Sequence, residues 1–264
     1  MSNQSNKEKV LTALKNKTLI KIISGIQNHD RQKTLNIAMA AEMGGASALD
    51  ICDDKEIIKT VRASVSLPLF VSSTEAKKLI EAQNYGACVL EVGNYESFYK
   101  ISRLFTRKEV LEIAKEVKKS LDKNVLLCVT VPGTLEIENQ VKLAKELLSL
   151  GVDILQTEGF APDTPASDRL DKTYTDILKA VSTLANTLEL RKALPEANII
   201  CASGITPTTA PLALALGASG IGAGTYINTL FTQNEMEEKV KEIVESVNSL
   251  TPQYLETKTL ALKV

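Results

Sequence analysis

The stretch that decides the fold is Asn198–Asn228, NIICASGITPTTAPLALALGASGIGAGTYIN. Its first five residues, 198–202, form a short apolar run typical of a strand, and Ser203-Gly204 ends that run with a turn. Pro211 suits the first position of a helix, where its missing N–H costs nothing. Gly217 suits the left-handed residue that ends the helix. The stretch therefore begins with a strand, a glycine turn and a helix.

The same pattern then starts again. Residues 218–221 are expected to form the next buried strand, and Gly222-Ala223-Gly224-Thr225 to open another helix. Glycine turns that follow strands let backbone N–H groups approach a ligand closely, and a helix N-terminus adds partial positive charge. Many (β/α)₈ barrels hold a phosphate after strands seven and eight. We therefore expect a phosphate site made by Ser203, Gly204, Gly222, Ala223, Gly224 and Thr225.

Apolar strand-like runs alternate with amphipathic helical runs along the whole chain. This order predicts a parallel sheet with helical crossovers. We expect eight strands, at 18–24, 46–52, 68–72, 87–92, 124–130, 153–158, 198–202 and 218–221. A (β/α)₈ barrel typically needs about 250 residues, and the chain has 264. A doubly wound sheet would carry G-x-G-x-x-G after its first strand, which here ends in Ser24-Gly25. The prediction is an α/β fold with a single (β/α)₈ TIM barrel.

The barrel is expected to occupy residues 18–250. Residues 1–17 contain a short helix that we expect to cover the N-terminal mouth of the barrel, and 251–264 form a tail that docks on it. The exit loops of the fourth and sixth strands, 94–107 and 159–172, are long enough to act as lids over the active face. The first of these loops contains several of the chain's few aromatic residues.

Composition excludes several function classes. The net charge of -1 and the pI near 6.0 give no general attraction to nucleic acid or to an anionic membrane. No apolar run reaches transmembrane length. The four cysteines have no C-x-x-C spacing and there is one histidine, so we expect no metal site and a reducing compartment. Oligomeric state is left open, with a homo-oligomer as one option.

Four ionisable residues are candidates for catalysis because they lie in or at the ends of predicted strands. Lys21 lies between isoleucines in the first strand, and its burial would require a carboxylate partner. Asp50, Glu91 and Glu158 end later strands at the face where such barrels place their active sites. They could supply acid, base and electrostatic groups, or they could form a structural ion pair across the barrel.

The sixth strand adds a possible ligand contact. Gln156 and Glu158 point to the same side because strand side chains alternate, and Gly159 follows them at the strand end. His29, in the first exit loop, is interpreted as part of a helix-capping turn.

Two resemblances add to this interpretation. The segments KIISGIQNHD, SALDICDD, LEVGNYESFY, CASGITP and GAGTYIN resemble the family called hypothetical chloroplast open reading frame twenty-three, essentially from end to end. That family is encoded in algal plastid genomes and in cyanobacteria and has no assigned activity. The resemblance implies a phosphate-binding barrel from a plastid stroma or a cyanobacterial cytoplasm, and it implies no reaction.

The segments GVDILQTEG and CASGI…LALGASGIGAGTYI are also similar to the flavin-binding half of nitronate monooxygenases. That similarity implies FMN and phosphate contacts from Gln156, Gly159, Ser203, Gly204, Gly222, Gly224 and Thr225. Two features depart from that pattern: Phe160-Ala161-Pro162 replaces the expected histidine, and one glycine follows Ser203 where two are usual. The similarity thus implies phosphate binding without the oxidase chemistry.

The sequence therefore predicts a barrel that binds a small phosphorylated ligand at its C-terminal face. The leading hypothesis is an enzyme with isomerase or lyase chemistry on a phosphorylated metabolite. The alternatives are an FMN-dependent oxidoreductase and a non-catalytic sensor of a phosphorylated ligand.

Overall fold

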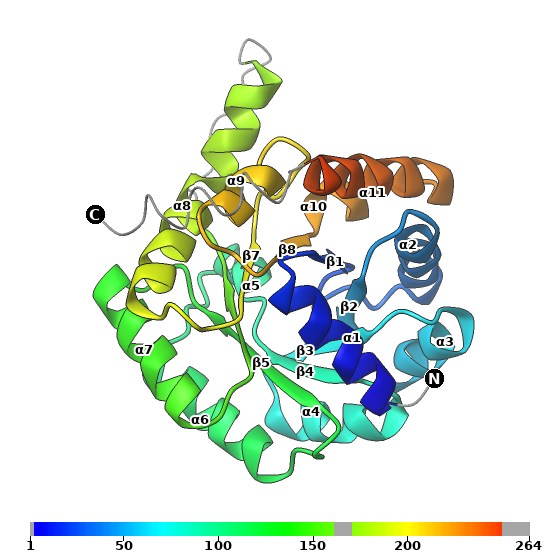
Figure 1. Ribbon diagram of the computed structural model, residues 1–264. Coiled ribbons are helices and arrows are strands. Elements are labelled where there is room, and N and C mark those ends of the chain that lie inside the picture. Colours follow the sequence, from blue (N-terminus) through cyan, green and yellow to red (C-terminus); the bar gives the residue numbers. More distant parts are fainter. Residues whose placement is uncertain (1–2, 161–170, 250–264) are drawn as a thin grey trace.

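The computed structural model describes residues 3–160 and 171–249, and it contains a closed parallel barrel (Figure 1). Each strand pairs with the next along the chain, and β8 pairs with β1 to close the barrel. The strands are β1 (Leu19–Ile23), β2 (Ala48–Cys52), β3 (Leu69–Ser73), β4 (Val89–Val92), β5 (Leu126–Val131), β6 (Ile154–Thr157), β7 (Ile199–Ala202) and β8 (Gly220–Ala223). The predicted TIM barrel is confirmed.

The helices lie around the outside of the barrel, apart from α1, which lies across one end of it (Figure 1). They are α1 (Asn3–Lys15), α2 (Arg31–Met43), α3 (Lys55–Ser64), α4 (Ala76–Ala82), the 3-10 turn η1 (Gln83–Tyr85), α5 (Glu96–Tyr99), α6 (Arg107–Lys119), α7 (Ile137–Ser149), α8 (Lys172–Ala193), α9 (Ala210–Ala215), α10 (Thr225–Asn228) and α11 (Gln233–Asn248). Two of them begin with a capping box, Thr106 with Glu109 in α6 and Thr232 with Glu235 in α11. These boxes satisfy backbone N–H groups that a helix start leaves free.

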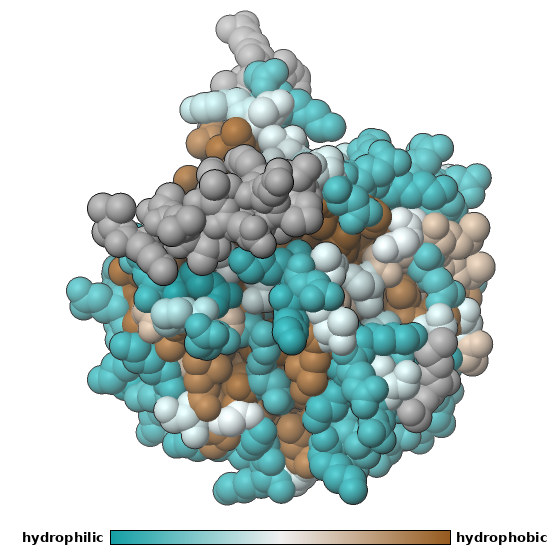
Figure 2. Space-filling view, in the orientation of Figure 1, coloured by the Kyte–Doolittle hydropathy of each residue, from teal (hydrophilic) through white to brown (hydrophobic). Residues whose placement is uncertain are grey.

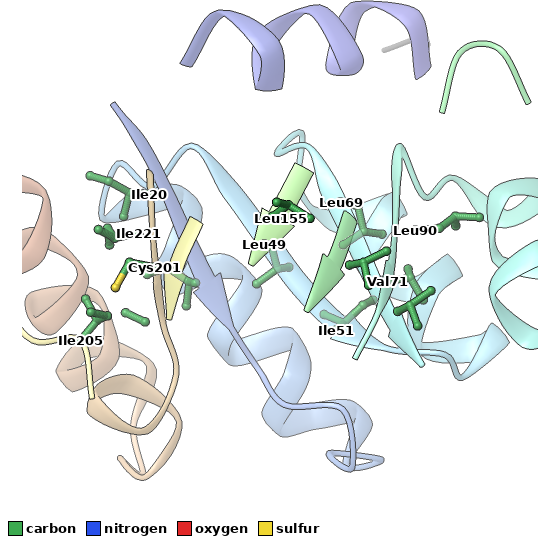
Figure 3. Packing of buried hydrophobic residues seen from close by; sticks show 14 of the residues in the cluster. Ile20, Leu49, Ile51, Leu69, Val71, Leu90, Leu155, Cys201, Ile205 and Ile221 are labelled. Atoms are coloured by element: carbon green, nitrogen blue, oxygen red, sulfur yellow. The ribbon is translucent and has the colours of Figure 1, made fainter. Parts of the chain in front are cut away.

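The hydrophobic residues form two layers. The larger cluster lies between strands and outer helices, and Figure 3 shows several of its members, among them Ile51, Val71 and Ile221. The smaller cluster fills the barrel interior next to the N-terminal mouth, where Val10 and Leu14 of α1 pack with inward-facing strand residues. Helix α1 thus covers the N-terminal mouth of the barrel, as the sequence predicts.

All eight strands agree with the predicted ranges within two residues at each end. The main correction concerns β8. Gly222 and Ala223 belong to this strand, so the turn after it begins at Gly224. Glycine is needed inside β8 because a Cβ at Gly220 would lie 2.6 Å from the Cβ of Leu19 in the neighbouring strand. A run of glycines fits a close strand contact as well as a turn.

The molecular surface is mixed, with hydrophilic residues prevailing in the view of Figure 2. Among residues 3–160 and 171–249, no helix has the length and apolar character to cross a membrane. All four cysteines are free and buried. The predicted tail, 251–264, and most of the predicted lid at 159–172 lie outside the described residues.

Candidate functional site

Three of the ionisable candidates for catalysis meet inside the barrel, toward its C-terminal end. Lys21, Asp50 and Glu91 point inward from β1, β2 and β4, and their side chains are at most 1% exposed. The Lys21 Nζ lies 2.5 Å from Glu91 Oε2 and 3.9 Å from Asp50 Oδ2. Glu91 and Asp50 are therefore the carboxylate partners that the sequence led us to expect for a buried Lys21.

Neutral polar side chains complete this cluster. The Ser72 hydroxyl donates to Asp50 Oδ1 at 2.6 Å, and Thr130 donates to Glu91 Oε1 at 3.2 Å. The Gln156 amide nitrogen donates to the same Glu91 oxygen at 2.6 Å. We call Lys21, Asp50, Ser72, Glu91, Thr130, Gln156 and Asn94, which is described next, the buried polar network.

Asn94 links this network to the outside. It follows β4 with a positive φ of 67°, a conformation that asparagine tolerates better than most residues. Its Nδ2 donates to Asp50 Oδ2 at 2.7 Å and to Ser72 Oγ at 2.8 Å, and its Oδ1 accepts from Gln156 Nε2 at 2.8 Å. Asn94 also lines the cleft above, so it connects the network to the cleft.

The charges of the network favour an electrostatic role for Lys21. Burial by itself lowers the pKa of Lys21, but the attraction of Glu91 and Asp50 outweighs it and raises the pKa above its ordinary value. Burial raises the pKa of Asp50 to about 7, although Lys21 acts in the opposite direction. A lysine that stays protonated at neutral pH is neither a base nor a free amine nucleophile.

A cleft lies at the C-terminal end of the barrel, with a volume of about 160 Å³. Its lining consists of Ile23, Gly25, Ile26, Asn94, Glu96, Ser97, Lys100, Glu158, Ala202, Ser203, Gly204, Gly224, Thr225 and Asn228. Pockets for drug-sized ligands measure roughly 300–1,000 Å³, so this cleft suits a small ligand. Lys100 is the one cation among its described lining residues.

Four of the six predicted phosphate-binding residues line this cleft: Ser203, Gly204, Gly224 and Thr225. Ser203 and Gly204 have successive positive φ angles of 76° and 69°, and consecutive residues of unusual backbone conformation can form an anion-binding concavity. Helices α9 and α10, which follow the two turns, have only six and four residues. An anion would therefore rely on loop backbone and Lys100 more than on helix dipoles.

The other predicted contacts lie elsewhere. Gly222 faces the barrel interior, where a Cβ would lie 3.5 Å from Gln156 Oε1. Ala223 packs in the outer hydrophobic cluster. Gly159 lies beside α8, since a Cβ there would be 3.5 Å from the backbone nitrogen of Thr183. None of these three residues is among the described residues that line the cleft, and neither is Gln156.

Glu158 is the ionisable candidate that reaches the cleft. Its Oε2 accepts from the backbone N–H of Tyr95 at 2.9 Å, and its Oε1 accepts from the Tyr99 hydroxyl and from Gly133 N at 3.4 Å. Burial raises the pKa of Glu158 to about 8, and the Tyr99 hydrogen bond only partly opposes this. At neutral pH this carboxyl group is therefore mainly protonated.

The loop after β4 contributes residues that sequence reasoning missed. Helix α5 places Glu96, Ser97 and Lys100 on the cleft, and Glu96 Oε2 accepts a hydrogen bond of 2.9 Å from Ser203 Oγ. Asn228, at the end of α10, donates to the carbonyl oxygens of Ile23 and Ser24 at 3.2 Å. The only sequence signal for α5 was the length of this loop.

Three aromatic residues of the same loop pack against one another, while Tyr99 contacts Glu158 of the cleft, and the lid role expected for this loop stays a prediction. The rings of Tyr95 and Phe105 lie 4.3 Å apart, and Phe98 meets Phe105 edge to face at 5.5 Å. Tyr95 and Phe105 are buried, so these rings form a small hydrophobic cluster that supports α5. The polar side chains of α5, rather than its aromatic residues, line the cleft.

Comparison with known proteins identifies the family. The family described as "Protein of unknown function (DUF561)" matches residues 1–253. The chain belongs to this family. A protein titled "Uncharacterized protein ycf23" from Cyanidium caldarium is 38% identical over 92% of this chain and 97% of its own. The proteins of the same title from Porphyra purpurea and Cyanophora paradoxa are 36% and 32% identical, covering 91% and 92% of this chain and 89% and 98% of their own.

These relatives confirm the first resemblance, and their sources agree with a plastid or cyanobacterial origin. The resemblance to nitronate monooxygenases receives no support from the comparisons. FMN also fits the site poorly. The cleft of about 160 Å³ is small for a three-ring cofactor, and the Gln156 amide nitrogen is bonded to Glu91 and Asn94 inside the barrel.

Solved structures agree on the fold. (S)-3-O-geranylgeranylglyceryl phosphate synthase from Thermoplasma acidophilum, in complex with sn-glycerol-1-phosphate, superposes with a TM-score of 0.62 at 14% identity, over 92% of this chain and 98% of that chain. Tryptophan synthase subunit alpha from Legionella pneumophila gives 0.61 at 12%, over 95% and 100%. A 3-hexulose-6-phosphate synthase gives 0.58 at 15%, over 86% and 99%. At these identities the similarity establishes a TIM barrel.

Proposed function

We propose that this protein is an enzyme that acts on a small phosphorylated metabolite, with isomerase or lyase chemistry, in the cleft at the C-terminal end of the barrel. One observation carries the proposal: Ser203, Gly204, Gly224 and Thr225, which we expect to bind the anion, line the same cleft as the Glu158 carboxyl group, whose pKa is raised by burial. A phosphate bound at the turns would leave the rest of a short ligand beside an acid. Two of the fold neighbours are named for phosphorylated compounds, which supports this ligand class.

The phosphate group would lie against the backbone of Ser203-Gly204 and Gly224-Thr225, with Lys100 supplying a positive charge. Backbone N–H groups and a lysine are the usual partners of a phosphate. The apolar side chains of Ile23 and Ile26, on the same cleft, would contact the carbon skeleton. This arrangement fixes which end of the ligand meets Glu158.

Glu158 would act as the general acid. Its O–H bond breaks as the proton moves to the ligand, and the carboxylate that remains keeps the hydrogen bonds from Tyr99 and the Tyr95 backbone. The resulting carboxylate can then remove a proton from another atom of the ligand. This step regenerates the acid and completes an isomerisation without any other reactant. Lys21, Asp50 and Glu91 would act from below the cleft, with the Lys21 charge stabilising negative charge that develops on the ligand.

The test combines binding with turnover. Inorganic phosphate and a panel of phosphorylated hydroxy and keto compounds of three to six carbons are titrated by calorimetry, and turnover is followed by NMR. We expect Lys100→Ala to weaken binding about tenfold or more. Lys145→Ala is the matched control, since Lys145 is exposed near the end of α7, toward the opposite end of the barrel.

Glu158→Gln should remove turnover while phosphate binding is retained. Binding of a panel member without turnover by the parent protein would favour the sensor alternative over an enzyme. No binding of any phosphorylated compound would overturn the proposal as a whole.

A further inference from the structure

One polar atom in the buried polar network has no partner among the described residues. Gln156 is 0% exposed, and its Oε1 accepts no hydrogen bond. A buried acceptor without a donor loses its hydrogen bonds to water and gains none in return, so native proteins rarely leave one without a reason. The other side-chain polar atoms of the network, including the amide nitrogen of the same side chain, are bonded.

The network fixes the orientation of this amide. Glu91 forms the ion pair with Lys21, and a carboxylate can only accept hydrogen bonds. The Gln156 nitrogen must therefore face Glu91, at 2.6 Å. Asn94 requires the same orientation of the Gln156 amide. Its nitrogen donates to Asp50 at 2.7 Å, so only its oxygen faces Gln156. Rotating the Gln156 amide by half a turn would bring acceptor against acceptor.

The fixed Oε1 points toward Gly222 on β8. A Cβ at that position would lie 3.5 Å from the oxygen, 3.0 Å from Ile23 Cδ1 and 3.1 Å from Ala202 Cβ. Ile23 and Ala202 both line the cleft. The missing side chain at Gly222 thus leaves only a narrow gap between these two cleft residues and the unpaired oxygen, and a ligand hydroxyl group would enter it by displacing the flexible end of Ile23.

We propose that Gln156 Oε1 accepts a hydrogen bond from a hydroxyl group of the ligand, and that the ligand is therefore a phosphorylated hydroxy compound. This inference rests on the proposed function, since it takes the phosphate to be bound at the turns after β7 and β8. Sites that hydrogen-bond a ligand hydroxyl discriminate strongly against the analogue without it, because the protein acceptor then stays buried and unpaired.

Calorimetry with two phosphate monoesters tests the contact. We expect the parent protein to bind glycerol 3-phosphate at least about tenfold more tightly than n-propyl phosphate, which has the same phosphate and no hydroxyl group. The compounds 2-hydroxypropyl phosphate and 3-hydroxypropyl phosphate then identify the hydroxyl concerned. Equal affinities for glycerol 3-phosphate and n-propyl phosphate would overturn the hydroxyl contact alone. If no phosphorylated compound of the wider panel bound either, the proposed function would fail with it.

A pair of variants gives a readout that needs no ligand. Gly222→Ala fills the space without supplying a donor, whereas Gly222→Ser fills it and can donate to Gln156 Oε1. Gly222 has no positive φ, but a Cβ would also lie 3.1 Å from the Cβ of Ala202 on β7, so both variants should fold with reduced stability and are compared with each other. We expect the serine variant to melt at a higher temperature than the alanine variant, and both to bind the two phosphate esters equally. Equal melting temperatures would show that the oxygen already has a partner and would contradict the proposal.

Discussion

The ammonium nitrogen of Lys21 lies 2.5 Å from a carboxylate oxygen of Glu91, and neither side chain is exposed to solvent. Removing one partner of a buried ion pair leaves an uncompensated charge, which typically costs about 3–5 kcal/mol. We therefore expect Lys21→Met to lower the free energy of unfolding by about that amount, measured by chemical denaturation.

The double variant Lys21→Met with Glu91→Gln is the control for this prediction. It removes both charges, so it should recover a large part of the lost stability. A Lys21→Met protein as stable as the parent would show that the ion pair contributes nothing to folding. Lost turnover in the stable double variant would support the electrostatic role.

Two glycines of the expected anion site should respond differently to substitution. Gly204 has a positive φ of 69°, and a Cβ there would lie 2.7 Å from the backbone of Lys179 in α8. Gly204→Ala should therefore destabilise the protein by about 1–3 kcal/mol. A Cβ at Gly224 has no neighbour closer than 3.6 Å, so Gly224→Ala should fold normally and weaken phosphate binding.

Melting temperatures and phosphate titrations of the two variants separate these effects. A Gly224→Ala protein that binds phosphate as well as the parent would remove Gly224 from the site. A Gly204→Ala protein with unchanged melting temperature would contradict the close contact with α8.

The sequence was sufficient for the barrel and for the convergence of Lys21, Asp50 and Glu91. Strand alternation and the parallel order decide both, because inward-facing residues toward the same end of a closed barrel share one interior. The sequence was not sufficient to place the side chains of Asn94 and Glu96 at the site, because the position of a loop side chain depends on contacts with distant parts of the chain. Asn94 contacts Asp50, Ser72 and Gln156, which come from three different strands or strand ends.

Glu96 occupies part of the site expected to receive an anion. Its carboxylate accepts a hydrogen bond from the Ser203 hydroxyl at 2.9 Å, so it competes with a phosphate for that donor and repels it. We expect Glu96→Gln to increase the affinity for inorganic phosphate by roughly fivefold, because one negative charge a few ångströms away is removed. Low salt should enlarge the difference.

Glu245→Gln provides the matched control for this change of charge. Glu245 is exposed near the end of α11. In a (β/α)₈ barrel the helices run back from the C-terminal face, where the cleft lies, to the opposite face. Its removal should leave the affinity unchanged. Equal gains in both variants would attribute the effect to net charge and not to the contact with Ser203.

The last prediction concerns pH and Glu158. Burial raises the pKa of this carboxyl group from 4.5 to about 8. Between these two pH values the folded protein keeps a proton that the unfolded chain releases, so the free energy of unfolding must fall as pH rises and level off above about pH 8. A shift of this size corresponds to a change on the order of 4–5 kcal/mol. Asp50 contributes in the same direction up to about pH 7, so the total slope does not isolate Glu158.

Glu158→Gln isolates it, because glutamine does not titrate and the other groups remain. The lost or altered hydrogen bonds to Tyr95 and Tyr99 change stability by an amount that does not depend on pH. The difference in unfolding free energy between variant and parent should therefore shift in favour of the variant as pH rises from 5 to 8, when both are measured by urea denaturation. Parallel profiles for the two proteins would show that Glu158 titrates normally, and a carboxyl group that is ionised at neutral pH could not serve as the general acid.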